Sequence, residues 1–397
     1  MSYTHLEDKR ICLACLNDED LCGFSQGFVA TEKCDYCGHE NVEVVAIGGL
    51  AQYITECWSL EMDEAHNFVP YESREGGYLY PVYWTHDLVT GWDSPRETDT
   101  TIWTDEADLL EDLTELIGSD RVWAYLQSHY PEDGVHDVWS RFKQTLKHKA
   151  RFMAFHPSLK KPGSPHFSMD IDTPLEELGI AIKQFEMLRI VPEGHIFYRT
   201  RSSENPEDFN SARLIGTPKV EFAVKANRMS PVGIPMFYGG FTPELCLAEI
   251  DYDSKTQYAH IAKFACLRPL LLVDFTALPR IPSLYSSNRE LRPIARLVRS
   301  FAEEVSKPLI PSTEKVDHIE YIPTQAITEW LRYGFRVDGE KIDGVLYDSA
   351  KKKGTCGVLF FENEECIDSR IDQNRRSTPI LELLSYERFT PKESVAL

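Results

Sequence analysis

Three side chains with complementary chemistry follow one another in the second half of the chain. Arg228 lies in a turn-rich stretch, Tyr238 precedes two glycines, and Glu249 ends a short apolar run. An arginine binds phosphate oxygens in a forked geometry and an aromatic ring stacks on a flat base, while a carboxylate binds ribose hydroxyls and stabilises positive charge on the sugar. These are the groups that cleavage of a nicotinamide–ribose bond requires.

The local sequence indicates the elements that must position these residues. Residues 242–244 (Thr-Pro-Glu) are typical of a helix start, because a hydroxyl caps the first turn and proline fits the first helical position. Glu249 lies four residues after Leu245, so a helix places both on one side. Residues 236–240 read as a short strand that runs into glycines, which let a ligand approach the backbone. The alternative is that Glu249 belongs to an ordinary buried ion pair.

The region after residue 190 combines short β-favouring runs with helices. We expect strands at Ile196–Arg199, Pro235–Tyr238, Ala259–Phe264, Leu270–Asp274, Gly344–Tyr347 and Val358–Phe361, and helices near 243–250, 289–306 and 324–333. This pattern predicts an α+β domain. The chain contains neither a G-x-G-x-x-G turn between strand and helix nor a G-x4-G-K-[ST] loop, which argues against a Rossmann or P-loop nucleotide site.

Six short motifs in this half resemble the RES family, in the family's order. They are Ile196-Phe197-Tyr198-Arg199, Asn227-Arg228 leading to Gly233–Tyr238, Thr-Pro-Glu and Leu-Ala-Glu within 242–249, Tyr321–Gln325, Asp343–Ser349, and Gly357–Phe361. The family usually reads Gly-Gly-Arg-Trp-Asn around its first arginine. Residues 226–230 here read Ala-Asn-Arg-Met-Ser, so the aromatic residue after the arginine is missing.

The resemblance implies a fold like that of ADP-ribosyltransferase toxins, with NAD as the substrate. It also implies Arg228, Tyr238, Glu249 and Ser349 as active-site residues and Arg199 as an NAD contact. The implied function is that of a toxin that depletes cellular NAD, either as an NAD glycohydrolase with water or as an NAD phosphorylase with phosphate. The implied partner is an Xre-type antitoxin. Transfer of ADP-ribose to a protein is an alternative that the sequence leaves open.

Paired cysteines near the amino terminus predict a metal site. Two C-x2-C motifs are separated by eighteen residues and supply Cys12, Cys15, Cys34 and Cys37. Cytosolic thiols stay reduced, so this spacing indicates metal binding rather than disulfides. Four thiolates complete a tetrahedral zinc site without a position for water, so we expect zinc to be structural. Cys22 and His39 are spare candidates if one of the four cysteines is not a ligand.

Charge divides the chain into two chemically different parts. Residues 1–140 contain 29 acidic and 6 basic residues, whereas the rest contains 34 and 36. No apolar stretch approaches the roughly 18 residues that a membrane span needs, and the first 20 residues are acidic where a signal peptide would be apolar. We therefore expect a cytoplasmic protein without a membrane partner. An acidic chain also disfavours nucleic acid.

A length of 397 residues favours two or three domains. We expect a zinc ribbon at 1–45, a mainly helical domain at 46–185, a RES catalytic domain at 190–370 and a weakly docked or mobile tail at 371–397. Within the second of these, helices are expected at Asp105–Ile117, Asp120–Tyr130 and Val135–Phe155, followed by a linker at 159–166.

A basic run without acidic residues extends from residue 141 to 163. We expect its helix to pack on the acidic region that precedes it. The amino-terminal region also resembles the HEPN-type helical extension found before some RES domains, and HEPN ribonucleases use an Arg-x4–6-His motif. The pairs Arg141/His148 and Arg151/His156 both match that motif. A protein that cleaves or binds RNA, with an inert RES half, is therefore an alternative function.

Overall fold

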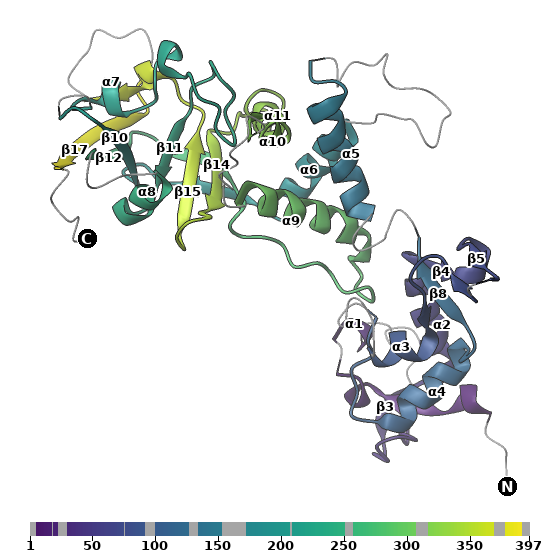
Figure 1. The fold of residues 1–397 in the computed structure, drawn as a ribbon. Coiled ribbons are helices and arrows are strands. Elements are labelled where there is room, and N and C mark those ends of the chain that lie inside the picture. Colours follow the sequence, from purple (N-terminus) through teal and green to yellow (C-terminus); the bar gives the residue numbers. More distant parts are fainter. Residues whose placement is uncertain are drawn as a thin grey trace. The chain divides into compact units, whose positions relative to one another are not determined.

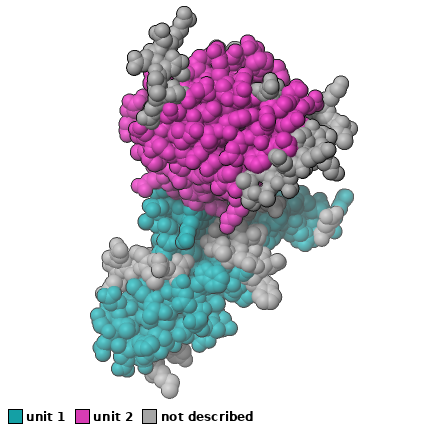
Figure 2. Space-filling model, turned by 90° about the vertical axis from the view of Figure 1, so that its left-hand side faces the viewer, with its two compact units in different colours: residues 1–138, 280–296 teal, residues 139–279, 297–397 magenta. Residues whose placement is uncertain are grey.

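The chain forms two compact units, which Figure 2 colours separately. The computed structural model describes residues 5–17, 19–22, 30–74, 76–91, 100–126, 134–152, 172–206, 209–250, 257–306, 317–368 and 378–390. The first unit comprises residues 1–138 and 280–296, and the second comprises residues 139–279 and 297–397. The structure thus divides the chain differently from the boundaries expected at 45, 185 and 370, which stay predictions.

The first unit contains small sheets and short helices. Its elements are β1 (Arg10–Cys12), α1 (Glu19–Cys22), β2 (Ala30–Glu32), β3 (Val42–Ala46), α2 (Ile47–Trp58), β4 (Met62–Glu64), β5 (Tyr71–Glu72), β6 (Gly77–Tyr78), β7 (Tyr83–Trp84), α3 (Thr85–Thr90), α4 (Ala107–Ile117) and β8 (Val122–Tyr125). Helix α2 buries Ile47, Leu50, Ile54 and Trp58, whose helical spacing forms one apolar face. This face belongs to a core that also contains Cys12, Cys15 and Cys34, so the cysteine-rich segment shares a core with the helices after it.

Strand β8 lies where the sequence analysis expected a helix at Asp120–Tyr130, and that prediction is wrong for Val122–Tyr125. The four residues Val-Trp-Ala-Tyr are β-branched or bulky around one alanine, and they pair with β4 and β7 in a three-stranded sheet. The expected helix at Asp105–Ile117 is confirmed as α4.

A segment from the second half of the sequence completes the first unit. Tyr285 is buried in the core of this unit, where its hydroxyl donates to the carbonyl of Thr100 at 2.6 Å and lies 2.9 Å from the Trp58 indole nitrogen. Arg292 and Arg296 both pair with the carboxylate of Glu61, which is 4% exposed. Burial opposes ionisation of Glu61, but the two guanidinium groups hold its pKa below the ordinary value of 4.5.

The second unit is built on a nine-stranded mixed sheet (Figure 1). Its elements are α6 (Asp172–Gln184), β9 (Leu188–Val191), β10 (Ile196–Ser203), α7 (Ala212–Ile215), β11 (Phe237–Gly240), α8 (Pro243–Glu249), β12 (Tyr258–Cys266), β13 (Leu270–Asp274), α10 (Asp317–Glu320), α11 (Ile322–Tyr333), β14 (Gly344–Asp348), β15 (Thr355–Leu359), β16 (Cys366–Ile367) and β17 (Leu381–Phe389). Two further helices, α5 (Gly134–His148) and α9 (Arg292–Ser306), begin in the first unit and end in this one.

The strand order brings distant parts of the sequence side by side. The order is β16-β17-β12-β10-β11-β15-β14-β13-β9, in which only β13/β14 and β16/β17 pair in parallel. In the centre, Tyr198 of β10 lies opposite Gly240 of β11, and Gly240 lies opposite Cys356 of β15. The expected α+β fold is confirmed, and all six expected strands are present with small shifts of their ends.

One expectation about the second unit is wrong, and another stays a prediction. The region expected as a tail contains strand β17, which pairs along its length with β12 and therefore belongs to the sheet. The basic helix α5 makes ion pairs within its own unit, because Lys143 contacts Glu304 of α9 at 3.3 Å and Lys147 contacts Glu320 of α10 at 2.5 Å. These acids neutralise two of its lysines, and the expected packing of the helix on the acidic region before it stays a prediction.

Helix α5 ends at His148 and residues 149–152 are not helical, so the expected helix at Val135–Phe155 is wrong beyond His148. Phe155 itself and the expected linker at 159–166 lie outside the described residues. No described helix combines the length and apolar character needed to cross a membrane.

We predict that Glu61→Gln destabilises the first unit by about 3–5 kcal/mol, because it leaves two buried guanidinium groups without their anion. Calorimetric unfolding measures this loss, and Glu56→Gln on the exposed side of α2 is the matched control. Because the folded pKa of Glu61 is depressed, its contribution is present above about pH 4.5 and is lost as the pH falls through the folded pKa. Equal unfolding temperatures for both variants at neutral pH would contradict the role of Glu61.

Candidate functional site

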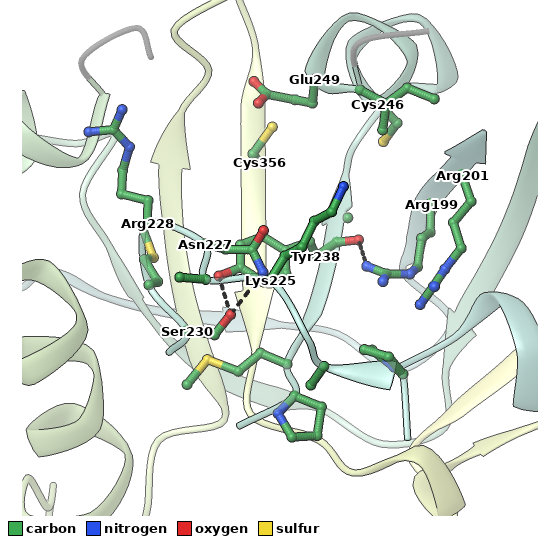
Figure 3. A pocket seen from close by; sticks show the side chains of 18 of the residues that line it. Arg199, Arg201, Lys225, Asn227, Arg228, Ser230, Tyr238, Cys246, Glu249 and Cys356 are labelled. Carbon is green, nitrogen blue, oxygen red and sulfur yellow. Dashed lines mark hydrogen bonds between the residues drawn. The ribbon is translucent and has the colours of Figure 1, made fainter. Parts of the chain in front are cut away.

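A cavity of about 530 Å³ opens over the centre of the nine-stranded sheet. Its lining residues come from β10, β11, β14, β15 and helix α8, and from the loop at 218–236. Figure 3 shows Glu249 at one side of the cavity, Tyr238 in its middle, and arginines on either side of Tyr238. The volume lies in the range that small-molecule sites occupy. All described lining residues belong to the second unit.

Glu249 and Ser349 form a hydrogen-bonded pair at the cavity. Thr242 caps helix α8 by accepting from the Leu245 amide at 3.3 Å, as its sequence predicts, and Glu249 is the last residue of the helix. Ser349 directly follows strand β14, and its hydroxyl donates to Glu249 Oε1. The Ser349 oxygen in turn accepts from the amides of Lys351 and Lys352, each at 3.2 Å. The serine therefore orients an anionic carboxylate.

A close approach between helix α8 and strand β11 sets the position of Glu249. A Cβ atom on Gly240 would lie 2.9 Å from Cys246 Sγ and 3.2 Å from the side chain of Leu245. Real Cβ atoms essentially never come as close as 2.9 Å, so a side chain at residue 240 would force Cys246 or helix α8 to shift. Cys246 is buried, and its thiol donates to the carbonyl of Tyr198 at 3.0 Å.

Tyr238 forms the middle of the cavity. Its hydroxyl lies 3.0 Å from the hydroxyl of Ser230, to which Asn227 Nδ2 donates at 3.2 Å. Burial raises the pKa of Tyr238 to about 12, so its phenol stays protonated at neutral pH. Gln325 holds the same loop, because its Nε2 donates to the Asn227 carbonyl at 2.8 Å. The ring of Tyr238 is thus fixed by its hydroxyl.

Arg228 lies on the opposite side of Tyr238 from Arg199 (Figure 3). Its Nη1 donates to the Glu304 carbonyl at 2.6 Å, and its guanidinium lies 5.7 Å from the Tyr321 ring. That distance is within the range of a cation–π contact. Met229 is buried and stands where the RES family, as the resemblance implies, has an aromatic residue. The aromatic face next to Arg228 comes instead from Tyr321, in another part of the chain.

Arg199 contributes mainly to the architecture of the cavity wall. It is 8% exposed, and its guanidinium donates to the carbonyls of Ile215 and Tyr238. The predicted site residues Arg199, Arg228, Tyr238 and Glu249 all line the cavity, and Ser349 reaches it through its bond to Glu249. Their roles stay predictions, because proximity does not test them.

The sequence analysis missed several residues that line or shape this cavity. They are Arg201, Ser230, Tyr321, Tyr347 and Lys351. Arg201 had a usable signal, since alternation along a strand places it on the same face as Arg199. Ser230 and Tyr321 had none, because only the loop conformation brings them to Tyr238 and Arg228.

The four expected cysteines form a cluster in the first unit. The sulfur atoms of Cys12 and Cys15 lie 3.6 Å apart, those of Cys12 and Cys37 lie 3.5 Å apart, and those of Cys15 and Cys34 lie 3.8 Å apart. Zinc–sulfur bonds of about 2.3 Å in a tetrahedron require sulfur separations of roughly 3.8 Å. The geometry therefore fits one tetrahedral ion. His39 Nδ1 lies 3.0 Å from Cys37 Sγ, outside the cluster of four, and the side chain of Cys22 lies outside the described part.

The two expected Arg-x4–6-His motifs are only partly visible. Arg151 donates to the carbonyls of Leu146 and Lys147, and so binds the end of helix α5. The side chain of Arg141 and the whole of His156 lie outside the described residues. The RNA-cleaving alternative stays untested.

The second unit is an α+β structure with a cavity over its central strands, and two known domain families match this sequence. The model for HEPN/RES N-terminal domain 1 matches residues 29–160, and the model for the RES domain matches residues 197–382. The second half of the chain thus matches the RES domain, and the region before it matches the HEPN/RES amino-terminal domain, as the motifs predict.

Among solved structures, the M. tuberculosis MbcT–MbcA toxin–antitoxin complex matches over 54% of this chain and 93% of its own chain, at 15% identity and a TM-score of 0.29. No curated protein sequence matches the chain.

We predict that Gly240→Ala destabilises the second unit by about 1–3 kcal/mol, because the added methyl group pushes helix α8 away from β11. Calorimetric unfolding measures the loss. The double variant Gly240→Ala/Cys246→Ala removes the closest clashing atom and should cost less than the sum of the single variants. Additive costs would show that the contact does not limit the packing of α8.

We predict that the purified protein contains about one tetrahedrally bound metal ion per chain, as elemental analysis would measure. Cys34→Ser should lower both the metal content and the unfolding temperature of the first unit, because metal binding contributes folding free energy. Cys57→Ala removes a cysteine outside the cluster and should keep the ion. Metal-free protein whose unfolding is unaffected by Cys34→Ser would contradict the prediction.

Proposed function

We propose that this protein is a toxin that cleaves the nicotinamide–ribose bond of NAD. The observation that carries the proposal is the Glu249–Ser349 pair at a cavity that also presents Tyr238 and arginines. A carboxylate held by a hydroxyl, beside an aromatic ring and cationic groups, matches the chemical parts of NAD. The RES domain match supports the same class of reaction.

In this proposal the carbon–nitrogen bond between ribose C1 and nicotinamide breaks, and its electron pair goes to the nicotinamide nitrogen. Positive charge develops on C1 and the ring oxygen. The anionic Glu249, oriented by Ser349, binds the ribose hydroxyls and stabilises that charge. The ring of Tyr238 stacks on the nicotinamide and keeps water away from it. Arg228 binds phosphate oxygens of the dinucleotide.

The acceptor completes the reaction by bonding its oxygen to C1. Water loses a proton and gives ADP-ribose, whereas inorganic phosphate gives ADP-ribose 1-phosphate. The first product would make the protein an NAD glycohydrolase and the second an NAD phosphorylase. Comparing the products formed in phosphate buffer with those formed in a phosphate-free buffer distinguishes the two.

The remaining parts of the proposal concern the metal and the partner. We infer that the ion held by Cys12, Cys15, Cys34 and Cys37 is zinc with a structural role, because four thiolates leave no coordination position for a substrate. An antitoxin of the Xre type, as the family resemblance implies, would be the partner that blocks NAD cleavage in the cytoplasm.

We predict that Glu249→Gln lowers NAD turnover by a factor on the order of 10²–10³, because it removes the charge that stabilises the transition state and keeps the shape of the side chain. The release of free nicotinamide measures turnover, with and without phosphate. Glu244→Gln removes a carboxylate from the same helix outside the cavity and should retain normal turnover.

If Glu249 were instead part of a structural ion pair, Glu249→Gln would unfold at a lower temperature and retain near-normal turnover per folded molecule. That result would contradict the catalytic role of Glu249. A wild-type protein that releases no nicotinamide in either buffer would overturn the proposed function itself.

A further inference from the structure

Two arginines lie side by side on the same face of strand β10. Arg199 and Arg201 are separated by one residue, so their side chains point to the same side of the sheet, and both line the cavity. Figure 3 shows their guanidinium groups next to each other, on the opposite side of Tyr238 from Arg228. The cavity therefore has a second cationic wall, which is separate from Arg228.

The two guanidinium groups differ in how they are bonded. Arg199 donates through Nε and Nη1 to two backbone carbonyls. Arg201 makes one hydrogen bond to a described residue, from Nη2 to the Gly216 carbonyl at 3.0 Å, and its guanidinium packs 5.2 Å from the Phe209 ring. The Nε of Arg201 is buried without a hydrogen-bond partner. A guanidinium has five N–H groups, so Arg201 retains unused donor capacity.

Neither arginine forms an ion pair with a carboxylate among the described residues. Burial, together with the like charge of neighbouring Arg201, lowers the pKa of Arg199 to about 9. Burial likewise lowers the pKa of Arg201 to about 10. Both shifts reflect the cost of burying a guanidinium charge, and that of Arg199 also reflects the like charge beside it. A buried charge of this kind is normally matched by a partner, and an anion in the cavity would supply it through the Nη groups, because Arg201 Nε has no accessible surface.

We propose that Arg201, next to Arg199, forms a subsite for a phosphate or diphosphate anion at the wall of the cavity. Arg199 supplies charge and the shape of the wall through its fixed carbonyl bonds, and Arg201 supplies the N–H donors that bind the anion's oxygens. A forked guanidinium suits such oxygens. The exposed Lys225, which also lines the cavity, adds positive charge at this side.

This subsite deepens the proposed function and rests on it for the identity of the anion. Two sources could supply an anion of this chemistry. One is the diphosphate of a bound dinucleotide, and the other is free phosphate that acts as the acceptor. Arg228 lies on the opposite side of Tyr238 from Arg201. A dinucleotide diphosphate bound at Arg201 would replace the phosphate-binding role proposed above for Arg228, whereas acceptor phosphate at Arg201 would leave that role in place.

The test measures binding rather than turnover. Isothermal titration of the full-length protein at constant ionic strength uses three probes, which are inorganic phosphate, pyrophosphate and ADP-ribose. The variant Arg201→Met keeps an apolar stem against Phe209 and removes the fork and the charge. Arg201→Lys keeps the charge alone. The control Arg213→Met removes an equal charge from an exposed position that does not line the cavity.

We expect the Arg201→Met variant to bind the relevant anion at least about tenfold more weakly, as expected for the loss of a charge-assisted hydrogen bond. Arg201→Lys should lose less affinity, and Arg213→Met should bind as the wild type does. If pyrophosphate and ADP-ribose are affected, the anion is the diphosphate of the dinucleotide. If inorganic phosphate is affected instead, the anion is the acceptor.

Either of two results would overturn the subsite. In the first, wild-type protein binds none of the three probes. In the second, the affinities of Arg201→Met protein for all three probes stay within twofold of those of the wild type. Thermal unfolding shows whether each variant is folded. If Arg201→Met has a folding defect, the affinities of Arg201→Lys decide whether the subsite exists. Wild-type protein that binds the anions without releasing nicotinamide from NAD would remove the proposed function and leave the subsite standing.

Discussion

The packing of helix α8 against strand β11 is the contact on which the candidate site depends. Gly240 permits this packing, because any side chain there would collide with Cys246 and Leu245. The helix is short and ends at Glu249, so a shift at its middle moves the carboxylate directly. The bond from Ser349 then fixes the carboxylate from the opposite side. Glu249 is therefore held by backbone packing and by one hydroxyl.

The order of the strands explains why the other groups meet at this carboxylate. Strand β11 lies between β10 and β15, and β14 lies next to β15, although these strands come from widely separated parts of the sequence. Arg199 and Arg201 thus reach one side of Tyr238, and the loop that contains Arg228 reaches the other. The result is one carboxylate facing two cationic walls. Such a charge distribution suits a ligand that carries phosphate groups and develops positive charge on its ribose.

The division into units does not follow the division of the sequence into family matches. Residues 280–296 lie within the RES match at 197–382 and nevertheless belong to the first unit. The buried carboxylate of Glu61 requires Arg292 and Arg296, because an unpaired buried charge is costly. The amino-terminal unit therefore needs a segment from within the RES match to complete its core. Neither half of the sequence alone contains every residue of the first unit.

The sequence by itself determined the features that depend on local chemistry. The C-x2-C spacing predicted the four-cysteine cluster, the Thr-Pro-Glu start predicted helix α8, and the ordered motifs predicted the RES family. It failed for the four-residue strand β8 and for the nine-residue strand β17, because both are decided by the strands they pair with rather than by their own residues alone. Only the tertiary structure placed Ser349 on Glu249, Tyr321 against Arg228 and Arg201 beside Arg199 at the cavity. Contacts between residues far apart in the chain arise from strand order and loop conformation, which no local pattern encodes.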